Sequence, residues 1–216
     1  MILTNKIALV TGGAVRIGRS ICEMLASEQA EVYCHYHRSE KEARQLKRTL
    51  NAKGSRIHLF QGDLTNIQTA EMIIREIVNK SGRVDILINN AAIFHKTPLG
   101  KVTEEVWDIL FALNLKAAFF CAQAAGIHMY EKGNGKIINI GDATGDNPWP
   151  SYIPYGITKS GIIAMTKGLA KALAPRVQVN CINPGPVLLP DSYSEDERNK
   201  AIKELDAAEK KLEALL

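Results

Sequence analysis

The fold is decided by the stretch Lys6-Ile7-Ala8-Leu9-Val10-Thr11-Gly12-Gly13-Ala14-Val15-Arg16-Ile17-Gly18. Its first part is a near-continuous apolar run, which is typical of a parallel strand covered on both faces. A glycine-rich turn follows and an amphipathic segment begins at Ile17, so the stretch predicts a strand, a turn and a helix. Glycines in such a turn let backbone N–H groups approach a pyrophosphate, which the positive end of the helix dipole also attracts. The stretch therefore predicts a phosphate-binding turn, although a plain tight turn would carry the same residues.

The same alternation of apolar runs and amphipathic segments continues along most of the chain. We expect strands at Lys6–Val10, Glu31–His35, Arg56–Gln61, Val84–Asn89, Gly135–Ile140 and Arg176–Ile182. We expect helices at Ile17–Ser27, Glu40–Asn51, Ile67–Lys80, Thr103–Tyr130 and Tyr152–Leu173. Strands and helices that alternate with short connections predict an α/β fold, a Rossmann-like doubly wound parallel sheet of six strands in three layers. Ligands of such sheets bind beyond the carboxyl ends of the strands, so the turns after the strands are the candidate site.

The composition favours one globular domain and excludes several other classes of protein. The chain has 216 residues, 46% of them hydrophobic, and a net charge of +4, which suits a single core. The charge excess is too small and too dispersed to predict a nucleic-acid partner. No apolar run approaches the roughly 18 residues needed to cross a bilayer, and no secretory signal precedes the first strand. Four scattered cysteines, with no zinc-like spacing, predict a cytoplasmic protein without a disulfide framework or a metal site.

The end of the second strand predicts the type of dinucleotide. An enzyme that prefers NAD places Asp or Glu here, but no carboxylate occurs between Glu31 and Glu40. Instead His37, Arg38 and Ser39 offer a guanidinium and a hydroxyl at the start of a helix, which suits a 2′-phosphate. We therefore expect NADPH as the cofactor, although Arg38 as an ordinary surface charge would look the same.

The next two turns carry residues that suit the rest of a dinucleotide. Asp63, followed by Leu64, can accept a hydrogen bond from an adenine amino group. Asn90 and Ala91 follow the fourth strand, where a small side chain lets a flat ring system pass close by. Either turn, taken singly, could be structural.

The strongest candidates for chemistry follow the fifth strand. Tyr155 and Lys159 are four residues apart, so a helix places both on one face. A phenol with a pKa of about 10 is a poor acid or base at neutral pH, but an adjacent ammonium favours the phenolate. Asp142 lies just past the strand, where its carboxylate could converge on the same point or serve only as a turn acceptor. Asn114, in the long fourth helix, could bond a backbone carbonyl and orient Lys159 through water.

Jointly these residues resemble the short-chain dehydrogenase/reductase family over Lys6–Pro186. The resemblance rests on the turn Thr11–Gly18, Asp63, Asn89-Asn90-Ala91, Asn114, Tyr155-x-x-x-Lys159 and Asn183-Pro184-Gly185. Most members have Ser at the position of Asp142 and Gly at that of Arg16. The combination of Arg16, His35–Ser39, Phe94 and Asp142 is similar to the pteridine reductase branch, which uses NADPH to reduce pterins and sometimes folates.

The resemblance implies a role for each of these positions. The implied cofactor-binding residues are Gly12, Arg16, Ile17, Gly18, His37, Arg38, Ser39, Asp63, Leu64, Asn90, Ala91, Lys159, Pro184 and Gly185. The implied catalytic residues are Asp142, Tyr155, Lys159 and Asn114. The implied substrate-binding residues are Arg16, Phe94, Asp142 and Tyr155, with Phe94 stacking on the pterin. A carboxylic acid at position 142 suits the delivery of a proton to a ring nitrogen.

The sequence thus predicts an NADPH-dependent reductase that converts dihydropterins to tetrahydropterins, with dihydrofolate as a further substrate. One alternative is a carbonyl or 3-oxoacyl reductase of the same family. Another is an NADPH-binding protein whose catalysis is impaired, because the usual substrate-covering segments are replaced at the end of the chain. We expect residues 1–193 to form the dinucleotide-binding reductase domain and 194–216 a terminal amphipathic helix of that domain, with a capping box at Ser194 and Glu197. A homodimer or homotetramer is expected, but the spacing of apolar residues fits inward packing equally well.

Overall fold

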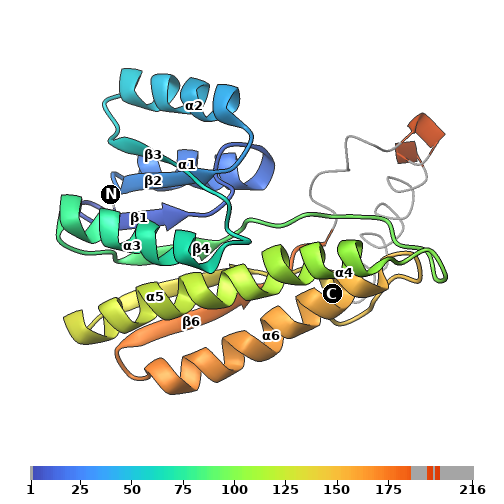
Figure 1. Ribbon diagram of the computed structural model, residues 1–216. Helices are drawn as coiled ribbons and strands as arrows, with labels where there is room; N and C mark the ends of the chain where they lie inside the picture. The colour runs from blue at the N-terminus through green and yellow to red at the C-terminus, as the bar shows by residue number, and fades with distance from the viewer. Residues whose placement is uncertain (1, 186–193, 197, 200–216) are drawn as a thin grey trace, which may run out of the picture. The chain divides into compact units, whose positions relative to one another are not determined.

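The computed structural model of this chain describes residues 2–185, 194–196, 198 and 199 (Figure 1). The chain divides into two compact units, Met1–Asn183 and Pro184–Leu216, each described by itself. In the second unit, the described residues on both sides of position 197 are helical, and the N–H of Arg198 donates to the C=O of Ser194 at 3.0 Å. The rest of the predicted terminal helix, with Glu197 of the capping box, lies outside the described residues. The predicted boundary between residues 193 and 194 stays a prediction.

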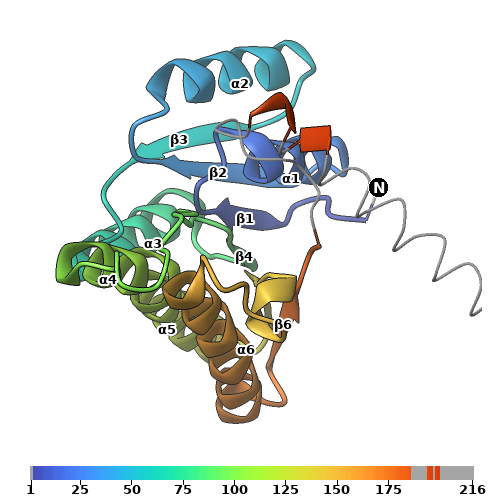
Figure 2. The same cartoon turned by 90° about the vertical axis from the view of Figure 1, so that its right-hand side faces the viewer.

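The first unit holds a six-stranded sheet with the order β3-β2-β1-β4-β5-β6 (Figure 2). The strands are β1 Ile7–Val10, β2 Glu31–Tyr36, β3 Ile57–Gln61, β4 Ile86–Asn89, β5 Gly135–Ile140 and β6 Val177–Ile182. All neighbouring pairs are parallel. The strand order reverses between β1 and β4, so the turns after these two strands open at the switch point of the sheet. The predicted doubly wound α/β sheet is confirmed.

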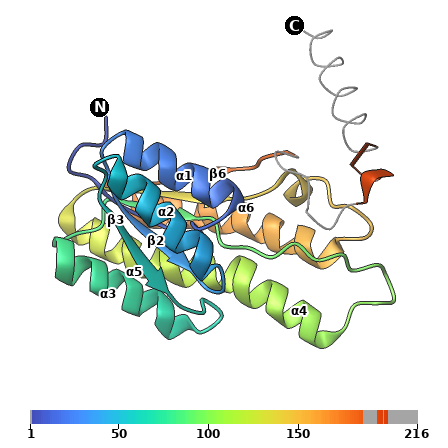
Figure 3. The same ribbon diagram turned by 90° about the horizontal axis from the view of Figure 1, so that it is seen from above.

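Helices cover both faces of the sheet. They are α1 Arg16–Ser27, α2 Glu40–Ala52, α3 Ile67–Ser81, α4 Glu104–Phe111, α5 Ala117–Lys132 and α6 Ile153–Leu173. Helices α1 and α2 lie on one side of the sheet, and α3 and α5 lie on the other (Figure 3). Alternate residues of β1 serve the two cores, because Ile7 and Leu9 pack with α3 and α5 while Ala8 and Val10 pack with α1 and α2. Burying each of Ile7, Leu9 and Val10 is worth roughly 1.5–3 kcal/mol.

The long helix predicted over Thr103–Tyr130 is interrupted. Helix α4 is followed by a π-helical turn, η1 Ala112–Lys116, after which the N–H of Ala117 donates to the C=O of Ala112. Helix α5 then runs to Lys132. The extra residue in this turn leaves no mark in the apolar spacing, so the sequence predicted a continuous helix. Single π turns of this kind are frequent at functional sites. The other predicted elements differ from the observed ones by two residues or fewer.

The run Glu104–Lys132 is long and apolar enough to cross a membrane by length and composition, and no other helix of the described chain passes that test. In this fold, however, it packs against the sheet. Ala118, Cys121, Ala122, Ala125 and Met129 of α5 are all buried, as expected for a core helix.

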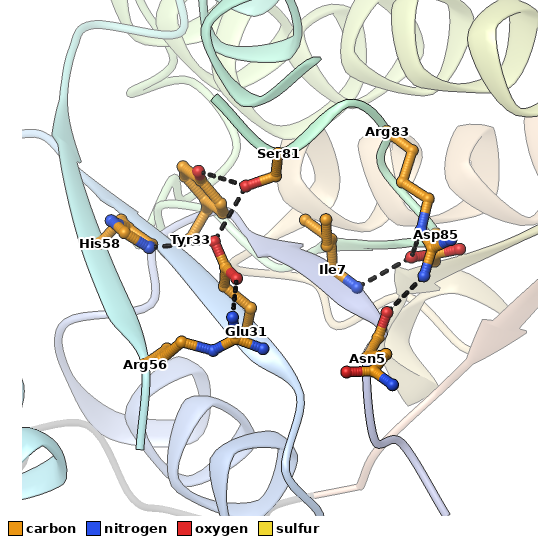
Figure 4. Close-up of polar contacts among 9 residues, drawn as sticks. All are labelled: Asn5, Ile7, Glu31, Tyr33, Arg56, His58, Ser81, Arg83 and Asp85. Carbon is orange, nitrogen blue, oxygen red and sulfur yellow. Dashed lines mark hydrogen bonds and ion pairs between the residues drawn. The ribbon is translucent and has the colours of Figure 1, made fainter. Parts of the chain in front are cut away.

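A polar cluster fixes the amino ends of the first strands, opposite to the switch-point turns (Figure 4). The carboxylate of Glu31 accepts a hydrogen bond from the Ser81 hydroxyl at 2.9 Å and pairs with Arg56 at 3.2 Å and His58 at 3.1 Å. The Tyr33 hydroxyl lies 2.9 Å from the same Ser81 oxygen. These contacts tie β2 and β3 to the end of α3.

Candidate active site

The glycine turn after β1 is fastened to the turn after β4. The Thr11 hydroxyl accepts hydrogen bonds from the backbone N–H of Asn90 at 2.9 Å and of Ala91 at 3.0 Å. The Asn90 side chain donates back to the carbonyls of Thr11 at 2.9 Å and Gly12 at 3.0 Å. Gly12 has φ +61°, and a Cβ there would lie 3.0 Å from Ala91 Cα; a Cβ at Gly18 would overlap the Gly12 carbonyl oxygen. The predicted residues Gly12, Gly18, Asn90 and Ala91 are therefore brought together, and the missing Cβ atoms are what allow it.

The donors of this turn differ from the expectation. The N–H groups of Gly12 and Gly13 are already used, because they donate to the Nδ1 atom and the carbonyl of His35 at 3.2 and 2.8 Å. The N–H groups that could face a phosphate are those that open α1. Its N-cap residue, Val15, supplies no side-chain cap, and no acidic residue stands in its first turn. An anion at this helix end would satisfy the exposed donors.

The first residues of α1 carry backbone strain. Arg16 has φ +50°, a conformation that favours glycine. Strain of this kind is common at ligand-binding positions. Arg16 is exposed and Ile17 half-buried at the mouth of the turn.

The residues predicted to hold the 2′-phosphate lie together at the end of β2. His37 and Arg38 are exposed, and Ser39 is the N-cap of α2 without a side-chain cap bond. Asp63 accepts from the Thr65 N–H at 2.9 Å and from its hydroxyl at 2.8 Å. These bonds lower the pKa of Asp63, and the charges of His37 and Arg38 act in the same direction. The turn after β3 therefore faces the end of β2.

Leu64 contributes to the core. Its side chain is 2% exposed and packs in the cluster beneath α3. Only its backbone can contact a cofactor.

Tyr155 and Asp142 form the centre of the candidate site. The Tyr155 hydroxyl donates to Asp142 Oδ2 at 2.9 Å. The other carboxylate oxygen accepts from the Thr144 N–H at 2.8 Å and from its hydroxyl at 2.7 Å, so Asp142 also caps the short 3₁₀ turn Ala143–Gly145. The reading of Asp142 as a turn acceptor is confirmed, and its carboxylate also reaches Tyr155; its part in catalysis stays a prediction.

The electrostatics of Tyr155 contradict the expectation that Lys159 favours its phenolate. Burial raises the pKa of Tyr155, and the negative charge of Asp142 raises it further. Lys159 Nζ lies 5.6 Å from the centre of the Tyr155 ring and donates instead to the Ile140 carbonyl at 2.8 Å. Burial lowers the pKa of Lys159 to about 8, against the opposing charge of Asp142. The phenol is therefore held as a proton donor, because the carboxylate is bonded to it and the ammonium is not.

Asn114 lies in the π-helical turn and is 2% exposed. Its side chain donates to the Ile93 carbonyl at 2.9 Å and accepts from the Ile93 N–H at 2.8 Å. The predicted bond to a backbone carbonyl is confirmed, and its effect is to fix the segment before Phe94. The predicted link to Lys159 through water stays a prediction.

Phe94 lies against Tyr155. Its ring stacks on Tyr152, with centroids 4.3 Å apart and planes 9° apart, and meets Tyr155 edge-on at 4.9 Å. Phe94 remains 39% exposed. Tyr152 was not predicted as a site residue; it is the N-cap residue of α6, three positions before Tyr155.

The last predicted residues are divided between the two units. Asn183 ends the first unit, where its side chain accepts from the Cys181 thiol at 3.1 Å. Pro184 and Gly185 open the second unit, so their predicted contact with a cofactor stays a prediction. Among the residues that the structure describes, no cluster of His, Cys, Asp and Glu could hold a metal ion.

The arrangement suits a bound dinucleotide. Three features lie beyond the carboxyl ends of the strands: the turn with Gly12 and Gly18, the uncapped start of α1 and the basic residues after β2. The carboxyl ends of β1, β4 and β5 lie side by side, because these parallel strands are neighbours in the sheet. A nicotinamide in this position would lie near the Tyr155 hydroxyl.

Comparisons with known proteins agree with this geometry. The family model described as short chain dehydrogenase matches residues 6–211. The 3-oxoacyl-(acyl-carrier-protein) reductase FabG of Staphylococcus aureus strain Mu50 is 33% identical over 207 residues, which is 94% of this chain and 84% of that protein. The crystal structure of a dehydrogenase/reductase from Sinorhizobium meliloti 1021 has a TM-score of 0.84 at 33% identity, covering 91% of this chain and 80% of that chain.

A second similar solved structure was determined with a dinucleotide bound. A short chain dehydrogenase from Burkholderia cenocepacia J2315 in complex with NADP has a TM-score of 0.80 at 32% identity, and the match covers 85% of this chain and 75% of that chain. The pteridine reductase branch is not shown by these relatives and stays a prediction. The fold, the site and the comparisons agree that this chain belongs to the short-chain dehydrogenase/reductase family of NAD(P)-dependent oxidoreductases.

Proposed function

We propose that this chain is a cytoplasmic NADPH-dependent reductase of carbonyl compounds, with 3-oxoacyl thioesters as the first substrate class. The observation that carries the proposal is a buried, protonated Tyr155 hydroxyl at the carboxyl edge of the sheet, beside a turn built for a dinucleotide. The name of the Staphylococcus aureus relative supports the substrate class.

The residues of the chain have separate tasks in such a reaction. NADPH, when bound, supplies a hydride to the substrate carbon. The Tyr155 hydroxyl, released from Asp142, delivers its proton to the substrate oxygen. Lys159 bonds Ile140 rather than the phenol, so it would act on the phenolate that forms only through its charge, 5.6 Å from the ring centre. Asn114 and Phe94 fix the wall of the site.

The choice of NADPH over NADH rests on the end of β2. Arg38 provides a fork of donors for a phosphate dianion, and β2 and the residues after it present no carboxylate before Glu40 except Glu31, at the opposite end of the strand.

A second candidate function is the reduction of dihydropterins, and of dihydrofolate. Asp142 is the observation that favours it, because a carboxylate 2.9 Å from the proton donor opposes the negative charge that develops on a carbonyl oxygen. A pterin instead needs a proton on a ring nitrogen, which this pair can deliver. The exposed face of Phe94 suits a flat ring.

One assay separates these functions. The absorbance of NADPH is followed with a 3-oxoacyl thioester, a simple ketone, dihydrobiopterin, dihydromonapterin and dihydrofolate in parallel, using Tyr155→Phe as the inactive control. Turnover of the thioester or ketone alone supports the first proposal, and turnover of a pterin or folate alone replaces it with the second. Binding of NADPH without turnover of any of them would indicate an impaired enzyme.

We also propose that two copies of the chain associate through α4, α5 and α6. These helices border an apolar groove of about 990 Å³ whose lining includes Phe111, Leu115, Phe119, Met165 and Leu169. An exposed apolar surface of this kind is typical of an interface. Light scattering should show a dimer or tetramer, and a monomer at micromolar concentration would refute the proposal.

A further inference from the structure

His35 is a buried histidine in the middle of the cofactor half of the sheet. It lies on β2, one residue before the strand ends, and is 2% exposed. Nδ1 accepts from the Gly12 N–H at 3.2 Å, and Nε2 lies 3.0 Å from the Gly62 carbonyl oxygen. A carbonyl can only accept, so Nε2 carries the proton and Nδ1 is bare. Both ring nitrogens are thereby satisfied in a single tautomer.

The two partners of this ring belong to different turns. Gly12 lies in the turn after β1, which faces the pyrophosphate position, and Gly62 opens the turn after β3 that continues into Asp63. Strand β2 lies between β1 and β3, so one imidazole spans the distance between the two turns. The backbone carbonyl of His35 adds a third bond, to the Gly13 N–H at 2.8 Å.

The glycine turn has little freedom on its other side. A Cβ at Gly13 would lie 2.8 Å from the sulfur of Cys22 and 2.9 Å from that of Cys34. The turn is therefore enclosed between these sulfurs and the bonds from His35. A change at the His35 ring would therefore act directly on Gly12 and Gly13, and α1 begins only three residues after Gly13.

We propose that His35 is a positioning residue for the dinucleotide, which fixes the separation between the pyrophosphate turn and the adenosine turn. The role rests on the proposed use of NADPH. Neutrality of the ring is part of it, since a protonated Nδ1 would face the Gly12 N–H donor. Burial lowers the pKa of His35 to about 4, although its bond to Gly62 opposes the shift, so the ring stays neutral at neutral pH.

The test compares three variants of the full chain by NADPH fluorescence titration and thermal unfolding. His35→Leu removes both ring bonds, and His35→Asn restores an acceptor near the position of Nδ1. Tyr33→Phe is the matched control, because Tyr33 is equally buried on the same face of β2, but its hydroxyl bonds Ser81 in the cluster at the opposite end (Figure 4). We expect His35→Leu to weaken NADPH binding about tenfold, because the glycine turn would then have to be ordered when the cofactor binds. His35→Asn should recover part of that loss, and Tyr33→Phe should change the melting temperature only.

A fragment of the cofactor separates positioning from general damage. Adenosine 2′-monophosphate can touch the adenosine turn but cannot reach the pyrophosphate turn. His35→Leu should weaken the whole dinucleotide at least fivefold more than this fragment. Equal weakening of both, or an effect no larger than that of Tyr33→Phe, would overturn the positioning role while leaving the use of NADPH intact. If the wild-type chain bound neither NADPH nor NADH, the proposed function and this role would fail together.

The ring itself offers a measurement that needs no variant. Nitrogen NMR of the wild-type chain at neutral pH should show a protonated Nε2 and a bare Nδ1 on His35. The opposite tautomer, or a charged ring, would overturn the role even if His35→Leu failed to fold.

Discussion

Replacing Asp142 with asparagine should make Tyr155 easier to ionise. The Tyr155 hydroxyl donates to Asp142 Oδ2 at 2.9 Å, so ionisation of the phenol places two negative charges at that separation. Asparagine keeps an acceptor for the Thr144 N–H and is itself a good N-cap residue, so the short turn should survive. The change removes the charge and replaces the acceptor Oδ2 with an N–H donor, and both effects favour the phenolate.

The size of the effect follows from two scales. Two unit charges about 3 Å apart repel by about 5 kcal/mol at an effective dielectric constant of about 20. Hydrogen bonds to charged partners contribute only about 1.5–3 kcal/mol in measured proteins, because solvent and neighbours relax. We take the smaller scale, about 2 kcal/mol, since it already includes that relaxation. This energy corresponds to a move of about 1.5 pH units toward neutrality in the ionisation of Tyr155.

The assay is the ultraviolet absorbance of tyrosinate as a function of pH. The chain has six tyrosines, so the signal of Tyr155 is the difference between Asp142→Asn and the double variant Asp142→Asn/Tyr155→Phe. The matched control is Asp146→Asn, which removes an exposed carboxylate from the end of the same turn. The alkaline limb of the activity profile should shift in the same direction. Ionisation of Tyr155 at an unchanged pH in Asp142→Asn would refute the assignment of its raised pKa to Asp142.

Three further predictions concern other parts of the site. Lys159→Met should stabilise the fold by about 2 kcal/mol at neutral pH and abolish turnover. The pKa of Lys159 in the folded chain, about 8, lies below its ordinary value of 10.5, so the stability of the wild-type chain should rise as the pH increases from 8 to 10.5. Urea unfolding of the variant should lack that rise. Arg38→Glu should weaken NADPH binding about a hundredfold and change NADH binding little, as isothermal titration would show; equal loss of both cofactors would remove Arg38 from the 2′-phosphate site. Gly18→Ala should destabilise the fold by about 3 kcal/mol and abolish NADPH binding, because the added Cβ would overlap the Gly12 carbonyl oxygen. Gly54 has φ +79° and open space around it, so Gly54→Ala should destabilise the fold by only about 1 kcal/mol and leave NADPH binding intact. Similar melting temperatures for the two variants would contradict this prediction.

The helices, strands and turns of this chain could be predicted from its sequence, but the partners of the site's hydrogen bonds could not. Apolar runs and glycine positions predicted the six strands, the order of elements and the turn at Gly12. These features depend on residue type and spacing alone. The position of Asp142 after the fifth strand left open whether it would meet Tyr155 or serve only as a turn acceptor, and the structure shows that it does both.

The direction of hydrogen bonds depends on atoms from distant segments. Sequence spacing placed Lys159 beside Tyr155, but the ammonium bonds the Ile140 carbonyl, and Asp142 determines the state of the phenol. Backbone N–H groups of the glycine turn were expected to approach a pyrophosphate, yet that of Gly12 is used by His35, which lies 23 residues away along the chain. Tyr152 became visible as part of the site only through its stack on Phe94.

The π-helical turn at Ala112–Lys116 has a consequence for the two helices that it joins. One surplus residue rotates everything after it by about 100° relative to a regular α-helix. The side chains of α5 therefore point in a different direction from the one that an uninterrupted helix would give them, and Asn114 lies in the turn where the direction changes. Deleting one residue from this turn would restore a regular helix, but it would rotate the buried face of α5 away from the sheet.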